Sequence, residues 1–454
     1  MEERELSNIL AFWQVLLIAL ALTVYVAGMC NAVIKWALPK DFDSTLDLIS
    51  APNVTSTLVF HMGIFVVLLY FVYLAYSHFS GHIFIGFSRA KPVFINPKPG
   101  HIVIYGRTGS GKSNTAKVII SEMRKKVPIL VLDWHGEYAS LKGFSLLVPG
   151  DNFSINPLDY RFGQLSEHID FLVDLFGDVY HFSEPQRYMF RSVLKHLYAD
   201  TSSPTLSQFM EVLEEMPIRS YYDHEIKMAL KRRLSGLIEG RAGKALSRKS
   251  TIELDELFSS NIVIDLSTFR SLYTKRLFCM ILLKLLYDYA TTKRGISPYV
   301  RHVTVIEEAW NVIPYRRLDS EPSIGERLFA ELRKHGELLI AVTQFPSETA
   351  WSIMKNARLI VLHSLPIKEF NVIGVDVGSS EPALKVGEAM LVEGSKVTKV
   401  NVRRVHEEEF SPQCMYEEVM EVREPSVTAK RCETVIPNEH KKNERYIRII
   451  LQRH

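Results

Sequence analysis

The stretch HIVIYGRTGSGKS, from His101 to Ser113, decides the fold of this chain. The apolar run 101–105 predicts a buried strand, and the residues that follow Ser113 predict a helix. A glycine-rich loop between a strand and a helix is typical of phosphate binding, because backbone N–H groups and the helix N-terminus then point at the phosphates. The stretch therefore predicts an α/β fold with a nucleotide site.

The loop and the first helical residues form the predicted nucleotide site. Lys112 is expected to bridge the β and γ phosphates, and the Ser113 hydroxyl is expected to bind magnesium. The predicted nucleotide-binding residues are Gly106, Arg107, Thr108, Gly109, Ser110, Gly111, Lys112, Ser113 and Asn114. ATP and Mg²⁺ are the cofactors that this set implies.

Further apolar runs predict the other strands of a mostly parallel sheet. The runs are 127–132, 262–264, 303–306, 338–342 and 359–362, and a hairpin is predicted over 387–403 with its turn at Glu393-Gly394. Polar residues follow several of these runs. Because the carboxyl ends of parallel strands meet at one edge of the sheet, where open α/β sheets bind ligands, we call this the catalytic edge.

Four side chains at the catalytic edge carry predicted roles in hydrolysis. Glu307 suits outer-sphere binding of magnesium, and Glu308 suits the general base that polarises the attacking water. Asp133 is expected to help order magnesium or the water, and Gln344 to sense the γ-phosphate from the strand beside the glutamate pair. Loop capping explains Asp133 and Gln344 equally well, and solvated acids at a strand end are the alternative for the glutamates.

The composition excludes several classes of protein. The chain has 454 residues, with 54 Lys or Arg against 51 Asp or Glu and a formal net charge of +3. These totals exclude a disulfide-stapled miniprotein, an acidic disordered chain and a strongly basic nucleic-acid protein. The 4 cysteines lack the spacing of a zinc ribbon or a disulfide framework. A mean hydropathy of +0.03 is high for a soluble enzyme and points to concentrated apolar segments.

Two apolar segments without formal charge, 9–34 and 58–79, predict transmembrane helices. As a helix the first would be about 39 Å long, whereas the hydrocarbon core is about 30 Å thick. A cleaved signal peptide and two buried core helices are the alternatives. Basic residues at 89, 91 and 98 favour a cytoplasmic position for the rest of the chain. The expectation is a two-span protein of the cell membrane, in contact with lipid.

Residues 165–258 predict an all-helical insertion in the sheet pattern. Basic residues concentrate over 227–249, with Glu239 as the one acid there. The candidate DNA-binding residues are Lys231, Arg232, Arg233, Arg241 and Lys244. A solvated helix face, or a loop packed on a neighbour, explains the same charges.

Taken together, the motifs resemble the HerA and FtsK superfamily of hexameric DNA-pumping ATPases, which includes the ATPases of conjugative type IV secretion. The matching motifs are GRTGSGKSN (106–114), LDWHGEY (132–138), INPL (155–158), IDLS (264–267), IEEAW (306–310), ELRKHG (331–336) and TQ (343–344). The resemblance covers about residues 100–405 and implies a RecA-like P-loop NTPase domain. The arrangement of two membrane spans ahead of an ATPase domain is similar to that of the conjugative coupling proteins and of the crenarchaeal DNA-exchange ATPases of the CedB group.

The resemblance also assigns residues. Lys112 and Ser113 bind the nucleotide, Asp133, Glu308 and Gln344 serve hydrolysis, and Arg333 looks like an arginine finger for the neighbouring subunit's site. The alternative for Arg333 is the solvated face of a helix over 326–334. Glu307 is a departure, because the family often has Asp there. The N-terminal β-barrel of soluble members has no room before the phosphate loop.

The sequence predicts a membrane-anchored, hexameric ATPase that translocates DNA across or toward the membrane, with a channel or pilus protein as a further partner. The predicted units are a transmembrane anchor (1–90), an ATPase domain in two parts (91–164 and 259–405), the helical insertion (165–258) and a charged C-terminal extension (406–454). A pilus or secretion-channel assembly ATPase that does not contact DNA is the main alternative. A scaffold with a degenerate nucleotide fold is disfavoured because the lysine, the hydroxyl and the carboxylates are all present.

Overall fold

The computed structural model describes residues 82–317, 321–376 and 382–405. The predicted spans, 9–34 and 58–79, and the extension 406–454 lie outside these residues. Within the described ranges, no helix is both long enough and apolar enough to cross a bilayer.

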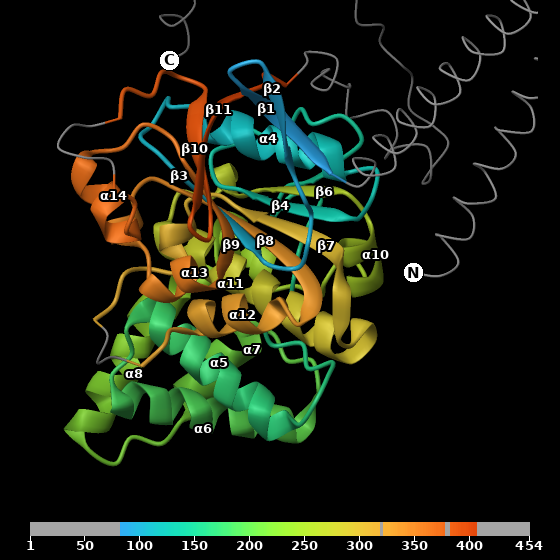
Figure 1. The fold of residues 1–454 in the computed structure, drawn as a ribbon. Coiled ribbons are helices and arrows are strands. Elements are labelled where there is room, and N and C mark those ends of the chain that lie inside the picture. Colours follow the sequence, from blue (N-terminus) through green and yellow to red (C-terminus); the bar gives the residue numbers. More distant parts are fainter. Residues whose placement is uncertain (1–81, 318–320, 377–381, 406–454) are drawn as a thin grey trace, which may run out of the picture.

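An 11-stranded sheet runs through the described part of the chain, in the order β2-β1-β11-β10-β9-β3-β8-β7-β4-β6-β5 (Figure 1). The strands are β1 (Ile83–Ser88), β2 (Lys91–Ile95), β3 (His101–Tyr105), β4 (Ile129–Asp133), β5 (Ser145–Leu147), β6 (Ile262–Asp265), β7 (Ser297–Ile306), β8 (His335–Thr343), β9 (Ala357–Leu362), β10 (Glu388–Glu393) and β11 (Lys396–Val402). From β9 to β5 neighbouring strands are parallel, whereas β10, β11, β1 and β2 extend the sheet with antiparallel pairs. The predicted largely parallel sheet is confirmed.

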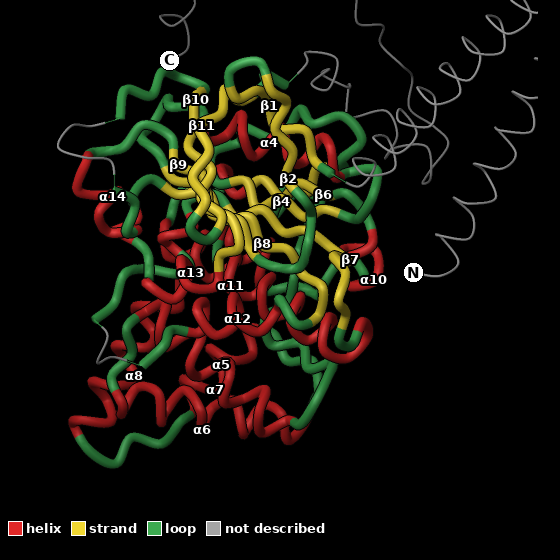
Figure 2. The backbone as a smooth tube through the Cα atoms, viewed as in Figure 1, coloured by secondary structure: helices red, strands yellow, loops and turns green. Residues whose placement is uncertain are grey.

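Helices cover both faces of this sheet. They are α4 (Lys112–Met123), α5 (Leu165–Tyr180), α6 (Glu184–Asp200), α7 (Leu206–Glu215), α8 (Tyr221–Leu234), α9 (Gly240–Leu246), α10 (Leu254–Ser259), α11 (Leu272–Tyr289), α12 (Ile324–Leu332), α13 (Trp351–Asn356) and α14 (Ile367–Ile373). Helix α4 covers one face, and α11, α12 and α13 cover the other, with α5 to α8 as an outer layer (Figures 1 and 2). Between β5 and β6 the structure has helices and no strand, as the insertion predicts.

Alternation along the strands explains the two layers. Every residue of β3 is buried. Ile102 and Ile104 contribute to the core beneath α4, whereas Val103 and Tyr105 contribute to the core on the face of the helical insertion. Successive side chains of a strand point to opposite faces, so a sheet covered on both sides needs an uninterrupted apolar run.

The sheet begins before the boundary at residue 91 that the sequence predicts. Strand β1 pairs with β11, with Gly86 opposite Val402. Gly86 has a φ of 152°, and a Cβ there would lie 2.0 Å from the Asn401 carbonyl oxygen. This close approach requires glycine. The pairing was missed because it joins segments more than 300 residues apart, which local periodicity does not connect.

Candidate active site

The phosphate loop lies between β3 and α4, and its glycines stand where a side chain would be strained or would clash. Gly109 and Gly111 have positive φ, of 76° and 109°. A Cβ on Gly106 would lie 2.6 Å from both the His363 Cβ and the Ser110 Oγ, so this position admits only glycine. The loop therefore has the backbone that the motif predicts.

Lys112 points back onto the loop in this structure. Its Nζ donates a hydrogen bond to the Arg107 carbonyl at 3.1 Å. Burial lowers the pKa of Lys112, while the charges of Glu308, Glu137 and Glu307 act in the opposite direction. The Lys112 charge is therefore influenced by the same carboxylates that would lie beside a bound nucleotide.

Strand order places Gln344 between the loop and the glutamate pair. Strand β8 pairs with β3 on one side and with β7 on the other. Tyr105 is in register with Thr343, and the Gly106 N–H donates to the Gln344 carbonyl at 3.0 Å. Gln344 therefore lies beside the phosphate loop, and its sensing of the γ-phosphate stays a prediction.

Glu307 is a buried carboxylate, and one of its two oxygens has no hydrogen-bond donor. It is 3% exposed, and its Oε2 has no hydrogen bond. Burial, followed by the negative charges of Asp133 and Glu137, raises the pKa of Glu307 to about 8. A divalent cation nearby would offset these charges, so the residues fit Mg²⁺. The described residues hold no cluster of three or more His, Cys, Asp or Glu ligands.

Glu308 follows directly and has a different environment. Its backbone is left-handed, with φ 46° and ψ 46°, which is uncommon for a residue with a side chain. The Trp310 indole Nε1 donates to its Oε2 at 2.6 Å, and the His135 Nε2 lies 3.5 Å from its Oε1. Its side chain is 17% exposed and so can meet a water molecule, as a general base must.

Asp133 organises the loop after β4. Its Oδ1 accepts hydrogen bonds from the N–H groups of His135, Gly136 and Glu137, and its Oδ2 accepts one from the N–H of Tyr138. Both oxygens are thus engaged, and loop capping, the alternative that the sequence left open, is what the structure places there. Asp133 acts on the site through this loop.

The Asn114 side chain bonds to the segment after β11. Its Nδ2 donates to the Arg403 carbonyl at 2.9 Å, and its Oδ1 accepts from the Val405 N–H at 3.2 Å. The side chain therefore ties α4 to the segment after β11. Its assignment to the nucleotide-binding set, which rests on its place directly after the motif, stays a prediction.

Arg333 lies far from its own phosphate loop. It is exposed at the end of α12, two residues before the 9-residue strand β8. At about 3.3 Å per residue, roughly 30 Å separate it from the catalytic edge. It lies close enough to His101, the first residue of β3, to act on that residue's charge. The structure does not bring Arg333 to its own site, so any catalytic role requires another subunit.

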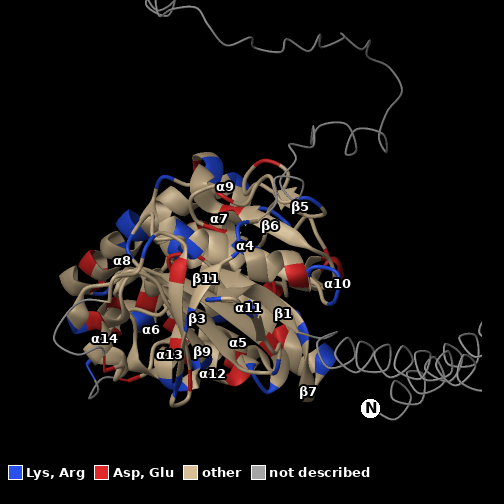
Figure 3. Cartoon of the chain, turned by 45° about the horizontal axis from the view of Figure 1, so that its top comes forward, with Lys and Arg blue, Asp and Glu red and all other residues tan. Residues whose placement is uncertain are grey.

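The Lys and Arg residues of the described chain are blue in Figure 3. The candidate DNA-binding residues among them divide into two groups. Lys231 pairs with Glu214 at 2.7 Å. Arg233 donates to Gln186 Oε1 at 2.6 Å, and Arg241 donates to the Pro149 carbonyl at 3.3 Å. In contrast, Arg232 and Lys244 are exposed and have no hydrogen bond or ion pair within the described residues. These two are the side chains that stay available for phosphates.

His363 supports the phosphate loop and was missed from the sequence. It follows β9 at the catalytic edge, with its Nδ1 3.0 Å from the Glu388 carbonyl oxygen and its Nε2 2.9 Å from the Thr115 hydroxyl. Burial lowers the pKa of His363 to about 4. The carbonyl requires a donor, so Nδ1 carries the proton and Nε2 accepts from Thr115. The rule that polar residues end strands at this edge would have found it.

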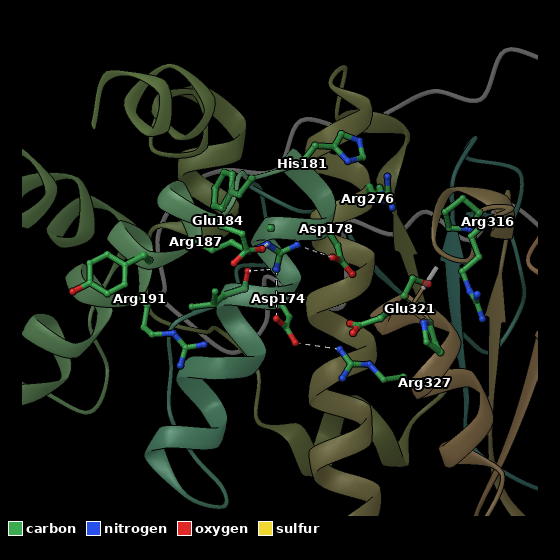
Figure 4. Close-up of a pocket in the computed structure, with 17 residues that line it drawn as sticks. Asp174, Asp178, His181, Glu184, Arg187, Arg191, Arg276, Arg316, Glu321 and Arg327 are labelled. Atoms are coloured by element: carbon green, nitrogen blue, oxygen red, sulfur yellow. Dashed lines mark hydrogen bonds and ion pairs between the residues drawn. The ribbon is translucent and has the colours of Figure 1, made fainter. Parts of the chain in front are cut away.

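A cavity of about 770 Å³ lies between the helical insertion and helices α11 and α12 (Figure 4). Arg187 on α6 pairs with Asp174 at 3.4 Å and with Asp178 at 3.2 Å, and Asp174 also pairs with Arg327 on α12 at 3.2 Å. The sequence did not predict this ionic seam. It joins the insertion to the helix that ends at Arg333.

The phosphate loop, the two glutamates at the end of β7 and the glutamine between them define a P-loop ATPase. Residues 87–286 match the protein-family model described as "Helicase HerA, central domain". Over those residues the chain is similar to the HerA proteins, and the site built from Lys112, Ser113 and the two glutamates fits ATP with Mg²⁺.

Solved structures share this fold. VirB4 of Thermoanaerobacter pseudethanolicus is 20% identical, with a TM-score of 0.57 over 72% of this chain and 98% of that chain. The bacterial conjugative coupling protein TrwB, in a form with sulphate, is 12% identical, with a TM-score of 0.54 over 71% and 90%. The plasmid coupling protein TrwB with a non-hydrolysable ATP analogue is 12% identical, with a TM-score of 0.51 over 68% and 87%. A comparison with curated proteins gave no match.

Proposed function

We propose that this chain is a membrane-anchored, ring-forming ATPase that couples ATP hydrolysis to the movement of DNA across or toward the membrane, as in conjugation-like transfer or uptake. The observation that carries the proposal is the separation of Arg333 from its own catalytic edge by the length of β8. Each nucleotide site then lacks the Arg333 guanidinium of its own chain, and the Arg333 guanidinium of a neighbouring subunit takes its place. A closed ring, with six subunits as in the HerA and FtsK proteins, provides one at every interface.

The proposed hydrolysis uses residues of two subunits. Lys112 binds the β and γ phosphates, and Glu308 accepts the proton of the attacking water. Arg333 of the neighbouring subunit offsets the charge that develops on the transferred phosphoryl group. Mg²⁺, when bound through Ser113 and near Glu307, supplies Lewis-acid stabilisation of the phosphate oxygens.

Two features support DNA as the cargo and the membrane as the location. The coupling proteins that share the fold are named as conjugative and plasmid coupling proteins. The apolar segments 9–34 and 58–79 are long enough to span a bilayer, and the basic residues after them favour a cytoplasmic motor. A membrane channel or pilus protein is the expected partner.

The decisive experiment measures the ATPase rate of the full-length chain in detergent with and without DNA. We expect DNA to raise the rate, and the effect to weaken steeply between about 50 and about 200 mM salt, because binding releases counterions from the phosphates. An active ATPase that ignores single-stranded and double-stranded DNA at every salt concentration would refute DNA transport. That result would favour an assembly ATPase for a pilus or secretion channel.

Charge variants locate the DNA contact. Replacing Arg232 and Lys244 together by Gln should reduce the DNA effect and its salt dependence, because both side chains are exposed and unpaired in the described structure. Arg233→Gln is the control on α8, beside Arg232, since Arg233 is already bound to Gln186. An equal loss in both variants would contradict the assignment.

A further inference from the structure

We infer that Trp310 and His135 are positioning residues that hold Glu308 in a resting orientation until nucleotide binds. The inference rests on the proposed role of Glu308 as the general base. It concerns the two contacts that the Glu308 carboxylate makes, with partners that both lie outside the phosphate loop.

The Trp310 contact is short and rigidly supported. The indole Nε1 donates to Glu308 Oε2 at 2.6 Å. Trp310 lies in the 3-10 turn Ala309–Asn311, directly after the left-handed Glu308. The Asn311 N–H and its Nδ2 both donate to the Glu308 carbonyl, at 2.9 Å and 3.1 Å. The indole is therefore held beside the carboxylate by the backbone, and the contact does not depend on a mobile side chain alone.

His135 approaches the other carboxylate oxygen from the neighbouring strand. Its Nε2 lies 3.5 Å from Glu308 Oε1. The loop that carries it is pinned by the Asp133 carboxylate, which accepts the His135 N–H at 3.2 Å. Lys275 on α11 also donates to the Trp134 carbonyl at 3.0 Å. The loop capping by Asp133 thus determines where His135 meets Glu308.

These contacts compete with the hydrolytic step for the oxygens of the Glu308 carboxylate. A general base must direct one oxygen at water, whereas both Glu308 oxygens already face a ring N–H or a ring nitrogen. A hydrogen bond donated to a carboxylate oxygen also occupies a lone pair that would otherwise accept from water. Lys112 lies close enough to feel the charge of Glu308 and is bound to the Arg107 carbonyl instead of phosphate. Moving Lys112 onto a nucleotide changes the charge beside Glu308, which is the event that would release it.

The test compares Trp310→Phe with the parent chain. Phenylalanine keeps the ring and removes the donor, so we expect turnover without DNA to rise about threefold to tenfold, with KM for ATP within about twofold. His135→Gln should raise turnover in the same direction and covers the case in which Trp310→Phe does not fold. Unchanged or lower turnover in both folded variants would overturn the inference.

Two controls separate this inference from its premise. Combining Trp310→Phe with Glu308→Gln should abolish turnover. If Glu308→Gln alone keeps its activity, Glu308 is not the general base, and the proposed function fails at that residue together with the holding role of Trp310 and His135. Tryptophan fluorescence gives an independent readout, because Mg·ATP should change the emission of the parent chain through loss of the indole–carboxylate bond. This change should be absent in Trp310→Phe and kept in Trp351→Phe, whose indole is exposed on α13. A change of equal size in Trp310→Phe would contradict release of Glu308.

Discussion

Lowering the pH from 7 to 5 is expected to destabilise the folded chain by about 5 kcal/mol through three histidines alone. His101, His168 and His363 are all buried, with exposed fractions of 0%, 5% and 0%. Burial lowers the pKa of His101 to about 4, that of His168 to about 3 and that of His363 to about 4. The folded chain thus keeps all three neutral at pH 5.

Between pH 7 and pH 5 the unfolded chain binds protons at these histidines, whereas the folded chain does not. An unfolded histidine has a pKa near 6.5, so it takes up most of a proton between pH 7 and pH 5. Well below pH 6.5 the free energy of unfolding falls by about 1.36 kcal/mol for each unit of pH, and by less near pH 6.5. Between pH 7 and pH 5 the loss is therefore about 1.8 kcal/mol for each histidine. Because the folded pKa is the lower one, stability falls as the pH falls from about 6.5 toward about 4.

Urea denaturation followed by circular dichroism at pH 7 and pH 5 measures this loss. His168→Gln isolates one contribution, since His168 lies in the insertion, with its Nε2 2.9 Å from the Tyr198 hydroxyl, which glutamine can also reach. The variant should lose about 1.8 kcal/mol of the pH dependence. His196→Gln, at an exposed position of α6, is the matched control. An identical pH dependence in His168→Gln and the parent chain would refute the reasoning.

Three further predictions concern the nucleotide site. Glu307 has a folded pKa of about 8, so binding of Mg·ATP at pH 7 should release up to about one proton, seen by calorimetry in buffers of different ionisation enthalpy, and Glu307→Gln should not release it. Mixing Arg333→Ala with Lys112→Ala chains should restore part of the ATPase activity, and no rescue at any ratio would count against a finger acting between subunits. Asn114→Ala should lower the free energy of unfolding by about 1 kcal/mol, through two lost hydrogen bonds, and leave ATP affinity within about twofold. A tenfold weaker affinity would return Asn114 to the nucleotide site.

Much of the site could be predicted because its elements are local. The motif around Lys112 occupies one strand, one loop and one helix, so its spacing along the chain is also its spacing in space. Glu307 and Glu308 were found because parallel strands end at one edge. The same rule would have found His363, which lies at the end of β9.

Tertiary contacts decided the roles of individual side chains. Asp133 and Asn114 have residue types suited to ligands, but each binds backbone groups instead. Lys231 and Arg233 count as free charges in a sequence, yet their partners Glu214 and Gln186 come from other helices. Charge patterns along a chain cannot show which cations are already paired.

By itself, the sequence determined the nucleotide chemistry and the parallel sheet, because both follow from residue spacing within single strand-loop-helix units. Only the tertiary structure decided that β1 joins the sheet, that Glu308 is held by Trp310 and His135, and that Arg333 lies at the far edge from its own site. Those features depend on which strands pair and on the direction in which β8 runs. Such long-range contacts are selected by packing of the whole domain and leave no local period in the sequence.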